Sequence, residues 1–156
     1  MKKKPPSDNT ICRNRKASHR FEILEKIECG IQLTGTEVKS LRQGGASIEE
    51  AYARIEDGEL WLVGAHIAPY RFGHVGSHEP TRRRKLLVHA RELRKLRQRV
   101  EQKGFTLIPL AMYFNERGIA KVMLAVVRGK RLTDKREDLK TRDHQREIER
   151  AMRRRR

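Results

Sequence analysis

Cysteine is scarce in this 156-residue chain, and a secretion signal is missing. Cys12 and Cys29 are the only cysteines, too few to staple a small secreted scaffold. The first nine residues carry three lysines, but no apolar segment follows them, as a signal peptide would require. We therefore expect a protein of the cytoplasm.

Long apolar runs are also missing. The longest, residues 107–114, is too short to cross a bilayer and contains Pro109. No other stretch alternates a broad apolar face with a basic one strongly enough to suggest an interfacial anchor. A membrane is therefore not an expected partner.

Motifs of common catalytic sites are absent. The chain has no Gly-x-x-x-x-Gly-Lys, no Gly-x-Ser-x-Gly and no His-Glu-x-x-His. The two cysteines lack the close spacing of a zinc site, so His74 and His78 are interpreted as solvated or RNA-facing residues of a loop. The sequence predicts neither an enzyme nor a metal or cofactor site.

Charge is what the chain has in excess. The formal net charge is +17 and the pI is near 10.6, and a field of this sign attracts phosphate polymers. Only eight residues are aromatic, which argues against base stacking at many positions. The composition therefore favours a protein that recognises a folded RNA by its shape and backbone.

The ends of the chain are its most polar parts. Residues 1–18 are rich in Lys, Pro and polar side chains and predict a flexible basic arm. In residues 128–156, thirteen of 29 residues are Lys or Arg, against six Asp or Glu, and apolar positions are sparse. We expect the tail, residues 130–156, to be disordered when free and helical when bound to a polyanion, since it contains helix-compatible ion pairs four residues apart.

Between these ends, residues 19–129 have the pattern of one small β domain. Asp57-Gly58 between two alternating segments predicts a hairpin, and residues 115–118 predict a second one. Gly30 suggests a bulge or bend in a strand-like stretch, and residues 69–80 predict a long loop. Helices are expected at 37–43 and 91–103. The fold class is mainly β: a small antiparallel barrel, closed and similar to oligonucleotide-binding (OB) folds, with inserted helices, and we expect a monomer.

A basic cluster precedes the short strand at residues 86–88. Its members, Arg82, Arg83, Arg84 and Lys85, repel one another and gain most when phosphates neutralise them. Trp61 alternates with leucines in a hairpin strand, which favours a place in the core or on the barrel face over a base-stacking role.

Several strings of residues resemble the SmpB family of bacterial SsrA-binding proteins. The resemblance covers residue 11 to the end of the chain, and the block from Thr34 to Arg42 is its most specific part. The strings are Asn14-Arg-Lys-Ala17, Thr34-Gly-Thr-Glu-Val-Lys-Ser-Leu-Arg42, Asp57-Gly-Glu59, His66-Ile-x-Pro69-Tyr70, Arg84-Lys-Leu-Leu87, Arg128-Gly-Lys130, Asp134-Lys-Arg136 and Lys140-x-Arg142.

The resemblance implies an OB-type barrel that binds transfer-messenger RNA and acts in trans-translation, the rescue of ribosomes stalled on broken messages. It places Asn14, Glu28 and Leu87 at RNA-binding positions. We expect the neighbouring cations to join them, namely Arg15, Lys16, Arg82, Arg83, Arg84 and Lys85.

The resemblance also implies that the tail occupies the ribosomal decoding site and the empty message channel as a helix. In relatives the position before Asp-Lys-Arg is often aromatic or His, whereas here it is Thr133. The residues expected to act in the ribosome are Gly129, Lys130, Arg131, Asp134, Lys135, Arg136, Lys140, Arg142, Ile148 and Met152.

Two other classes of protein share some of these features. A structural protein of the ribosome would have similar basic arms and a small β core, and it would remain on ribosomal particles after a high-salt wash. An RNA-modifying enzyme would show cofactor turnover, and the missing catalytic motifs disfavour it.

Overall fold

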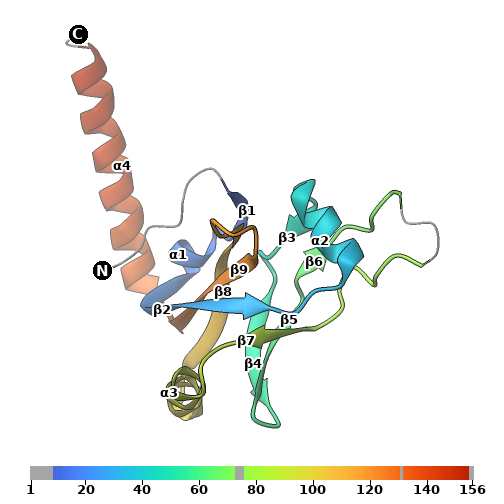
Figure 1. Cartoon of the computed structure of the whole chain (residues 1–156). Coiled ribbons are helices and arrows are strands. Elements are labelled where there is room, and N and C mark those ends of the chain that lie inside the picture. The colour runs from blue at the N-terminus through green and yellow to red at the C-terminus, as the bar shows by residue number, and fades with distance from the viewer. Residues whose placement is uncertain (1–8, 73–75, 131, 155–156) are drawn as a thin grey trace.

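The computed structural model describes residues 9–72, 76–130 and 132–154, without the side chains of residues 132–134. Strands dominate its first 130 residues and one long helix follows (Figure 1). The elements in chain order are β1 (Thr10–Arg13), α1 (Ala17–Arg20), β2 (Phe21–Ile31), α2 (Gly35–Arg42), β3 (Ala46–Ser47), β4 (Tyr52–Glu56), β5 (Glu59–Val63), β6 (His66–Ile67), β7 (Arg84–Leu87), α3 (Ala90–Glu101), β8 (Phe105–Phe114), β9 (Ala120–Gly129) and α4 (Leu132–Arg154).

Seven of the strands form one antiparallel sheet in the order β1-β8-β4-β5-β7-β2-β9, and β8 also pairs with β9. The pairings therefore run from β8 through β4, β5, β7, β2 and β9 and return to β8. A smaller sheet of β3 and β6 lies beside α2. The structure is thus mainly β, with one large antiparallel sheet and added helices.

Alternation along the strands separates the core from the surface. Leu60 and Leu62 on β5 are buried, whereas Trp61 between them is half-buried on the opposite face. Strands β8 and β9 are apolar on nearly every position and supply much of the core. From α3, Leu96 is buried in the same core. Burial of this apolar surface is the main force that holds the sheet together.

Both predicted hairpins are present. Strands β4 and β5 pair in register from Tyr52↔Val63 to Glu56↔Glu59. Asp57 and Gly58 both have positive φ, 50° and 72°, as the two-residue turn with the twist of a hairpin requires. The bulge expected at Gly30 is wrong: β2 is continuous through Gly30, and its irregularity lies between Ile23 and Glu25.

The predicted start of the domain needs correction. Residues 10–18 are not a flexible arm, because β1 pairs with β8 and Ala17 on α1 is buried against Ile108 and Val127. These contacts offset the entropy of ordering this segment. Residues 1–8 lie outside the described residues.

The described part of the tail is helical. Leu132–Arg154 form the helix α4, which projects away from the sheet (Figure 1). Its N-terminal part is held by an ion pair between Lys130 and Asp138. This pair ties the first turns of α4 to the residue that follows β9. Disorder of the free tail stays a prediction.

Candidate nucleic-acid interface

Glu28 and Tyr113 meet across strand β9. Glu28 lies opposite Met123 of β9, and Tyr113 lies opposite Lys121 on the other side of the same strand. The Tyr113 hydroxyl donates a hydrogen bond to Oε2 of Glu28. Burial, together with the hydrogen bond and the charge of Glu28, raises the pKa of Tyr113, so the hydroxyl remains a donor at neutral pH. The exposed carboxylate of Glu28 is therefore held in one orientation.

The fixed carboxylate can select among the groups of an RNA. A carboxylate only accepts hydrogen bonds, and it repels phosphate. Amino groups on base edges and ribose 2′-hydroxyls are the donors that RNA presents. Glu28 is thus suited to read a base or ribose, while the net charge of +17 of the chain attracts the backbone.

Leu87 lies beside this carboxylate on the next strand. Leu87 of β7 pairs with Gly30 of β2, two residues after Glu28, and its side chain is 50 % exposed. A Cβ added at Gly30 would lie 3.2 Å from the Cβ of Leu87, closer than a relaxed contact. The glycine therefore makes room for an exposed leucine that offers an apolar contact to a sugar or base face.

Asn14, expected at an RNA-binding position, is half-buried and bound to β8. Its backbone N–H donates to the Leu110 carbonyl at 2.8 Å, and its Nδ2 donates to the Pro109 carbonyl at 3.3 Å. Oδ1 is buried and has no hydrogen-bond partner among the described residues. The amide thus ties the end of β1 to β8. The following residues, Arg15 and Lys16, are exposed, and Lys16 pairs with Glu49 at 3.2 Å.

The basic cluster Arg82–Lys85, whose last two residues begin β7, is divided by the strand alternation. Arg83 lies 4.4 Å from the centre of the Trp61 ring and pairs with Glu56 at 2.8 Å. Lys85 pairs with Glu59 at 2.6 Å. Both pairs are partly exposed, so their Coulomb energy is small. Arg83 and Lys85 remain accessible to an RNA backbone.

Arg84, however, cannot contact RNA as predicted. Its side chain is 0 % exposed, and Nε donates to Oε1 of the equally buried Glu37 at 2.8 Å. The other guanidinium nitrogens donate to the carbonyls of Ala65 at 2.9 Å and Pro80 at 3.1 Å. A buried guanidinium needs all of these acceptors. Sequence could not separate Arg84 from its neighbours, because all four are basic.

Glu37 is the acid that pairs with Arg84. Arg82 also pairs with Glu37, at 2.8 Å. Burial by itself would raise the pKa of Glu37. Hydrogen bonds from Arg82, the Thr34 N–H and Arg84 outweigh burial and lower the pKa to about 2. The sequence pattern marks Glu37 only as an acid in the first turn of a helix. In the structure it joins α2 to β7 and to the segment before it.

Within the described ranges, no group of three or more His, Cys, Asp or Glu side chains could hold a metal ion. His78 instead bridges two parts of the chain, since Nε2 lies 2.9 Å from the Ile67 carbonyl and Nδ1 lies 3.1 Å from the Thr36 hydroxyl. A carbonyl oxygen only accepts, so Nε2 donates to Ile67, whereas the Thr36 hydroxyl can donate to Nδ1 or accept from it.

Comparison with protein families gives one match over nearly the whole chain. The family described as "SmpB protein" matches residues 11–154. The chain belongs to the SmpB family. The resemblance inferred from the sequence is confirmed.

Relatives named SsrA-binding protein cover most of this SmpB-family chain. The protein of Moorella thermoacetica is 59% identical over 142 residues, which are 91% of this chain and 92% of the relative. That of Chelativorans sp. is 53% identical over 146 residues, 94% of each chain. A chain of the solved structure described as "tmRNA-SmpB: a journey to the center of the bacterial ribosome" is 53% identical, with a TM-score of 0.65, and the match covers 82% of this chain and 93% of that one.

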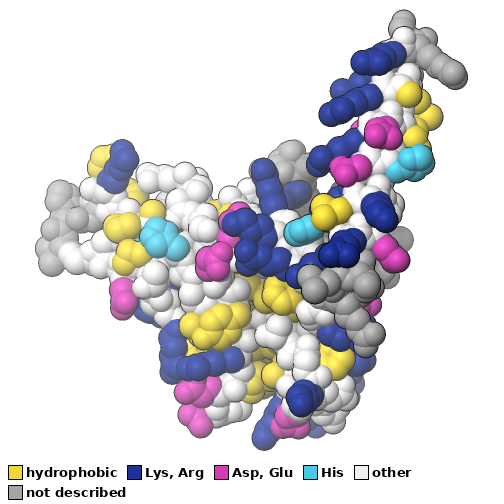
Figure 2. Space-filling view, turned by 180° about the vertical axis from the view of Figure 1, so that it is seen from behind, with side chains coloured by type: hydrophobic (Ala, Val, Ile, Leu, Met, Phe, Trp, Pro, Cys, Tyr) yellow, Lys and Arg dark blue, Asp and Glu magenta, His cyan; other side chains and the backbone are white. Residues whose placement is uncertain are grey.

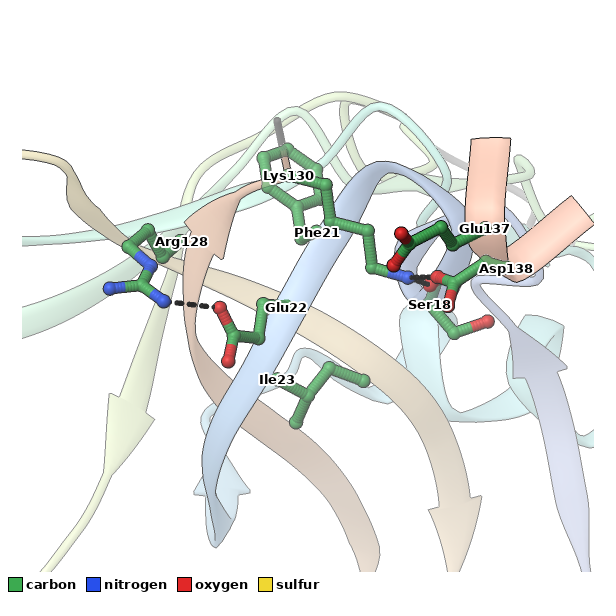
Figure 3. A pocket seen from close by; sticks show the side chains of 8 residues that line it. All are labelled: Ser18, Phe21, Glu22, Ile23, Arg128, Lys130, Glu137 and Asp138. Carbon is green, nitrogen blue, oxygen red and sulfur yellow. Dashed lines mark hydrogen bonds and ion pairs between the residues drawn. The ribbon is translucent and has the colours of Figure 1, made fainter. Parts of the chain in front are cut away.

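The start of the tail forms a second feature of this SmpB-family chain. Lys130 donates from Nζ to the Ser18 carbonyl at 2.7 Å and also to Asp138 of α4, and its side chain is only 13 % exposed. The hydrogen bond from Lys130 lowers the pKa of Asp138. Lys130 therefore joins α1, the end of β9 and the first turns of α4 (Figure 3).

An open pocket of about 530 Å³ lies at this junction. Figure 3 shows Glu22 and Arg128 paired on one side of it and Lys130 reaching towards Asp138 on the other. The pocket is lined by Ser18, Phe21, Glu22, Ile23, Arg128, Lys130, Glu137 and Asp138. Of the predicted Gly129-Lys130-Arg131 string, Lys130 is thus engaged within the molecule, whereas Arg131 lies outside the described residues.

Beyond this junction α4 is exposed along its length. Among the expected tail residues, Lys135 is half-buried and Arg136, Lys140 and Arg142 are exposed. The side chain of Asp134 lies outside the described part. Ile148 and Met152, four residues apart, are 44 % and 67 % exposed. In the outer half of the projecting helix, Figure 2 shows dark blue side chains on the left edge and yellow ones on the right edge.

No described helix is both long and apolar enough to cross a membrane.

Proposed function

We propose that this chain binds transfer-messenger RNA and delivers it to stalled ribosomes for trans-translation. Membership of the SmpB family and the relatives named SsrA-binding protein support this function. The observation that carries it in this structure is the carboxylate of Glu28, held by Tyr113 on a surface of a chain with net charge +17. A fixed acceptor within a cationic field matches the donors and phosphates of a folded RNA.

In this proposal the RNA lies on the outer face of β2 and β7. Glu28 accepts hydrogen bonds from a base or ribose, and Leu87 covers an apolar face. Asn14 acts by holding β1 in place, and Arg15 and Lys16 attract phosphates. Arg83 and Lys85 extend the cationic surface on the far side of Leu87. The ring of strand pairings supports a closed barrel of the OB type as the scaffold for this face.

The tail has a separate role in the proposal. A transfer-messenger RNA has no codon partner, so another group must occupy the decoding site when it enters. Helix α4, exposed and strongly basic, is suited to follow a channel lined by phosphates when no message fills it. Lys135, Arg136, Lys140 and Arg142 then contact the ribosomal RNA backbone.

Sequencing the RNA that co-purifies with the tagged full-length protein tests the function directly. Transfer-messenger RNA should be strongly enriched from cells. A Glu28→Ala variant should lose most of that enrichment and remain folded, with its thermal midpoint lowered by only a few degrees because the Tyr113 hydroxyl loses its acceptor. Retention on ribosomal particles after a high-salt wash, with no enriched free RNA, would instead identify a structural protein of the ribosome.

A further inference from the structure

An exposed aromatic side chain lies at the end of the segment that follows β6. Phe72 is 68 % exposed, the highest value among the large hydrophobic side chains of the described residues. Its ring meets Tyr70 edge to face, with 5.7 Å between the ring centres and 68° between the planes. The Nζ atom of Lys39, on α2, lies 5.5 Å from the centre of the Tyr70 ring. We call Lys39, Tyr70, Arg71 and Phe72 the Phe72 patch.

The patch lies beside an open groove of about 420 Å³. Ser40 of α2 and Gln43, which caps its end, line one side of this groove, and Pro69, Arg71 and Phe72 line the other. A base with its ribose and phosphate is a compact group that a groove of this size can receive. On the first side the exposed side chain of Gln43 offers an amide that can bind polar atoms on a base edge.

Several hydrogen bonds fix the base of this segment against α2. The Ser40 hydroxyl donates to the Ala68 carbonyl at 2.6 Å, and the Ala68 N–H donates to the Gly45 carbonyl at 2.7 Å. A Cβ added at Gly45 would lie 3.0 Å from the Cβ of Ala68. The Tyr70 N–H further binds the Ser77 hydroxyl at 3.1 Å. The exposed ring of Phe72 is thus presented from an anchored segment.

Charge around the patch has one sign. Residues 35–45 and 68–72 contain three cations, Lys39, Arg42 and Arg71, and all three are exposed. The only acid in these ranges is Glu37, which is fully buried and paired with Arg82 and Arg84. An exposed aromatic ring among uncompensated cations fits a nucleotide, because the ring stacks on a base and the cations neutralise its phosphate.

We propose that the Phe72 patch is a second RNA contact, on which an unpaired base of the bound transfer-messenger RNA stacks against Phe72 while its phosphate meets Arg71 or Lys39. The inference rests on the proposed function. Strand β2 carries Glu28 and leads within four residues of its end into α2, which forms one wall of the groove. In Figure 1 α4, the element assigned to the ribosome, leaves from the opposite side of the molecule. One RNA lying on Glu28 therefore continues towards Phe72.

Three substitutions at one position test the stacking. Phe72→Ala should weaken binding of purified transfer-messenger RNA to the full-length protein about tenfold, the typical loss when one stacked aromatic is removed. Phe72→Tyr keeps the ring and should bind like the wild type. Phe72→Leu keeps an apolar side chain without a ring and should bind like Phe72→Ala. Unchanged affinity of Phe72→Ala, or wild-type affinity of Phe72→Leu, overturns the proposal.

Photocrosslinking identifies the partner. The full-length protein with p-benzoylphenylalanine at position 72 is irradiated with transfer-messenger RNA and ribosomes together. A crosslink to transfer-messenger RNA is expected, whereas a crosslink to ribosomal RNA or to a protein instead overturns the assignment. The two proposals fail in different ways. A wild-type protein that does not bind transfer-messenger RNA contradicts the proposed function. If the wild type binds this RNA and Phe72→Ala binds it equally well, only the Phe72 contact is contradicted.

Discussion

Glu37 and Arg84 form a fully buried ion pair, with 2.8 Å between Nε and Oε1, that joins helix α2 to strand β7. The two residues are 47 positions apart in the chain. Through this pair one member of the basic cluster Arg82–Lys85 becomes part of the interior, while Arg83 and Lys85 stay accessible. The pair also holds β7, whose last residue is Leu87, next to β2.

Arg84→Met should destabilise the protein by about 3 kcal/mol, since removal of one partner leaves a buried charge poorly compensated. Arg82 still pairs with Glu37, so we expect the loss to be at the lower end of the usual range. Urea unfolding followed by circular dichroism measures it. Arg83→Met is the matched control, because its pair with Glu56 is exposed, and it should cost less than about 1 kcal/mol.

The role of Arg84 in RNA binding is checked with the same variants. Folded Arg84→Met should bind transfer-messenger RNA with nearly wild-type affinity, whereas Arg83→Met loses a surface cation and should bind more weakly. If Arg84→Met is as stable as the wild type but binds RNA weakly, Arg84 contacts RNA after all.

Stability should also depend on the protonation of Glu37. Its pKa is lowered from 4.5 to about 2 in the folded protein. The carboxylate therefore contributes its full stabilisation above pH 4.5, and this contribution is lost as the pH falls through about 2. Thermal midpoints measured between pH 6 and pH 2 should fall for the wild type. A Glu37→Gln variant should have a lower thermal midpoint at pH 6, and its midpoint should fall less between pH 6 and pH 2. If the midpoints of the two proteins fall in parallel, other groups control the acid sensitivity.

Tyr113→Phe should weaken binding of transfer-messenger RNA several-fold, because the carboxylate of Glu28 loses the donor that orients it. The buried ring remains, so the free energy of unfolding should change by only about 1 kcal/mol. Equilibrium binding and urea unfolding measure the two effects. Tyr52→Phe is the control, since Tyr52 is 42 % exposed and lies on another strand. A Tyr113→Phe protein that binds RNA normally would show that the hydrogen bond serves the fold alone.

Truncation after Gly129 should leave a folded domain that binds transfer-messenger RNA but does not support peptide tagging on stalled ribosomes. Helix α4 makes its described contacts mainly through Lys130 and Asp138 at the junction, so its loss leaves the sheet and the Glu28 face intact. Binding and tagging are measured on the same preparation. Equal losses of both would mean that tail and domain do not have separate roles.

Ile148→Pro should impair tagging far more than Ile148→Ala. Proline in a helix interior costs ~3 kcal/mol relative to alanine, and Ile148 is an exposed residue well inside α4. Binding of transfer-messenger RNA serves as the internal control and should be the same for both variants. If the two proteins tag equally well, the tail acts as an extended cationic strand and its helical form is irrelevant to function.

Local patterns in the sequence determined much of this protein. Asp57-Gly58 specified its hairpin because only a few residues tolerate positive φ, and the specific string from Thr34 to Arg42 identified the family. The start of α2 at Gly35 and the end of α3 at Glu101 each lie within two residues of the predicted position. Capping residues and glycines fix helix ends through contacts with their near neighbours in the sequence, so a local pattern is enough to predict them.

Tertiary structure alone decided which polar residues face the solvent. Arg83, Arg84 and Lys85 are equivalent in composition, but the alternation of β7 buries Arg84 against Glu37 and leaves its neighbours accessible. Tyr113 and Glu28 are 85 positions apart, and they meet only because β8 and β2 flank β9. Strand β8 is apolar on both faces, so no periodicity marked Tyr113. Such contacts depend on strand order and register, which couple distant segments and leave no signal in a local window.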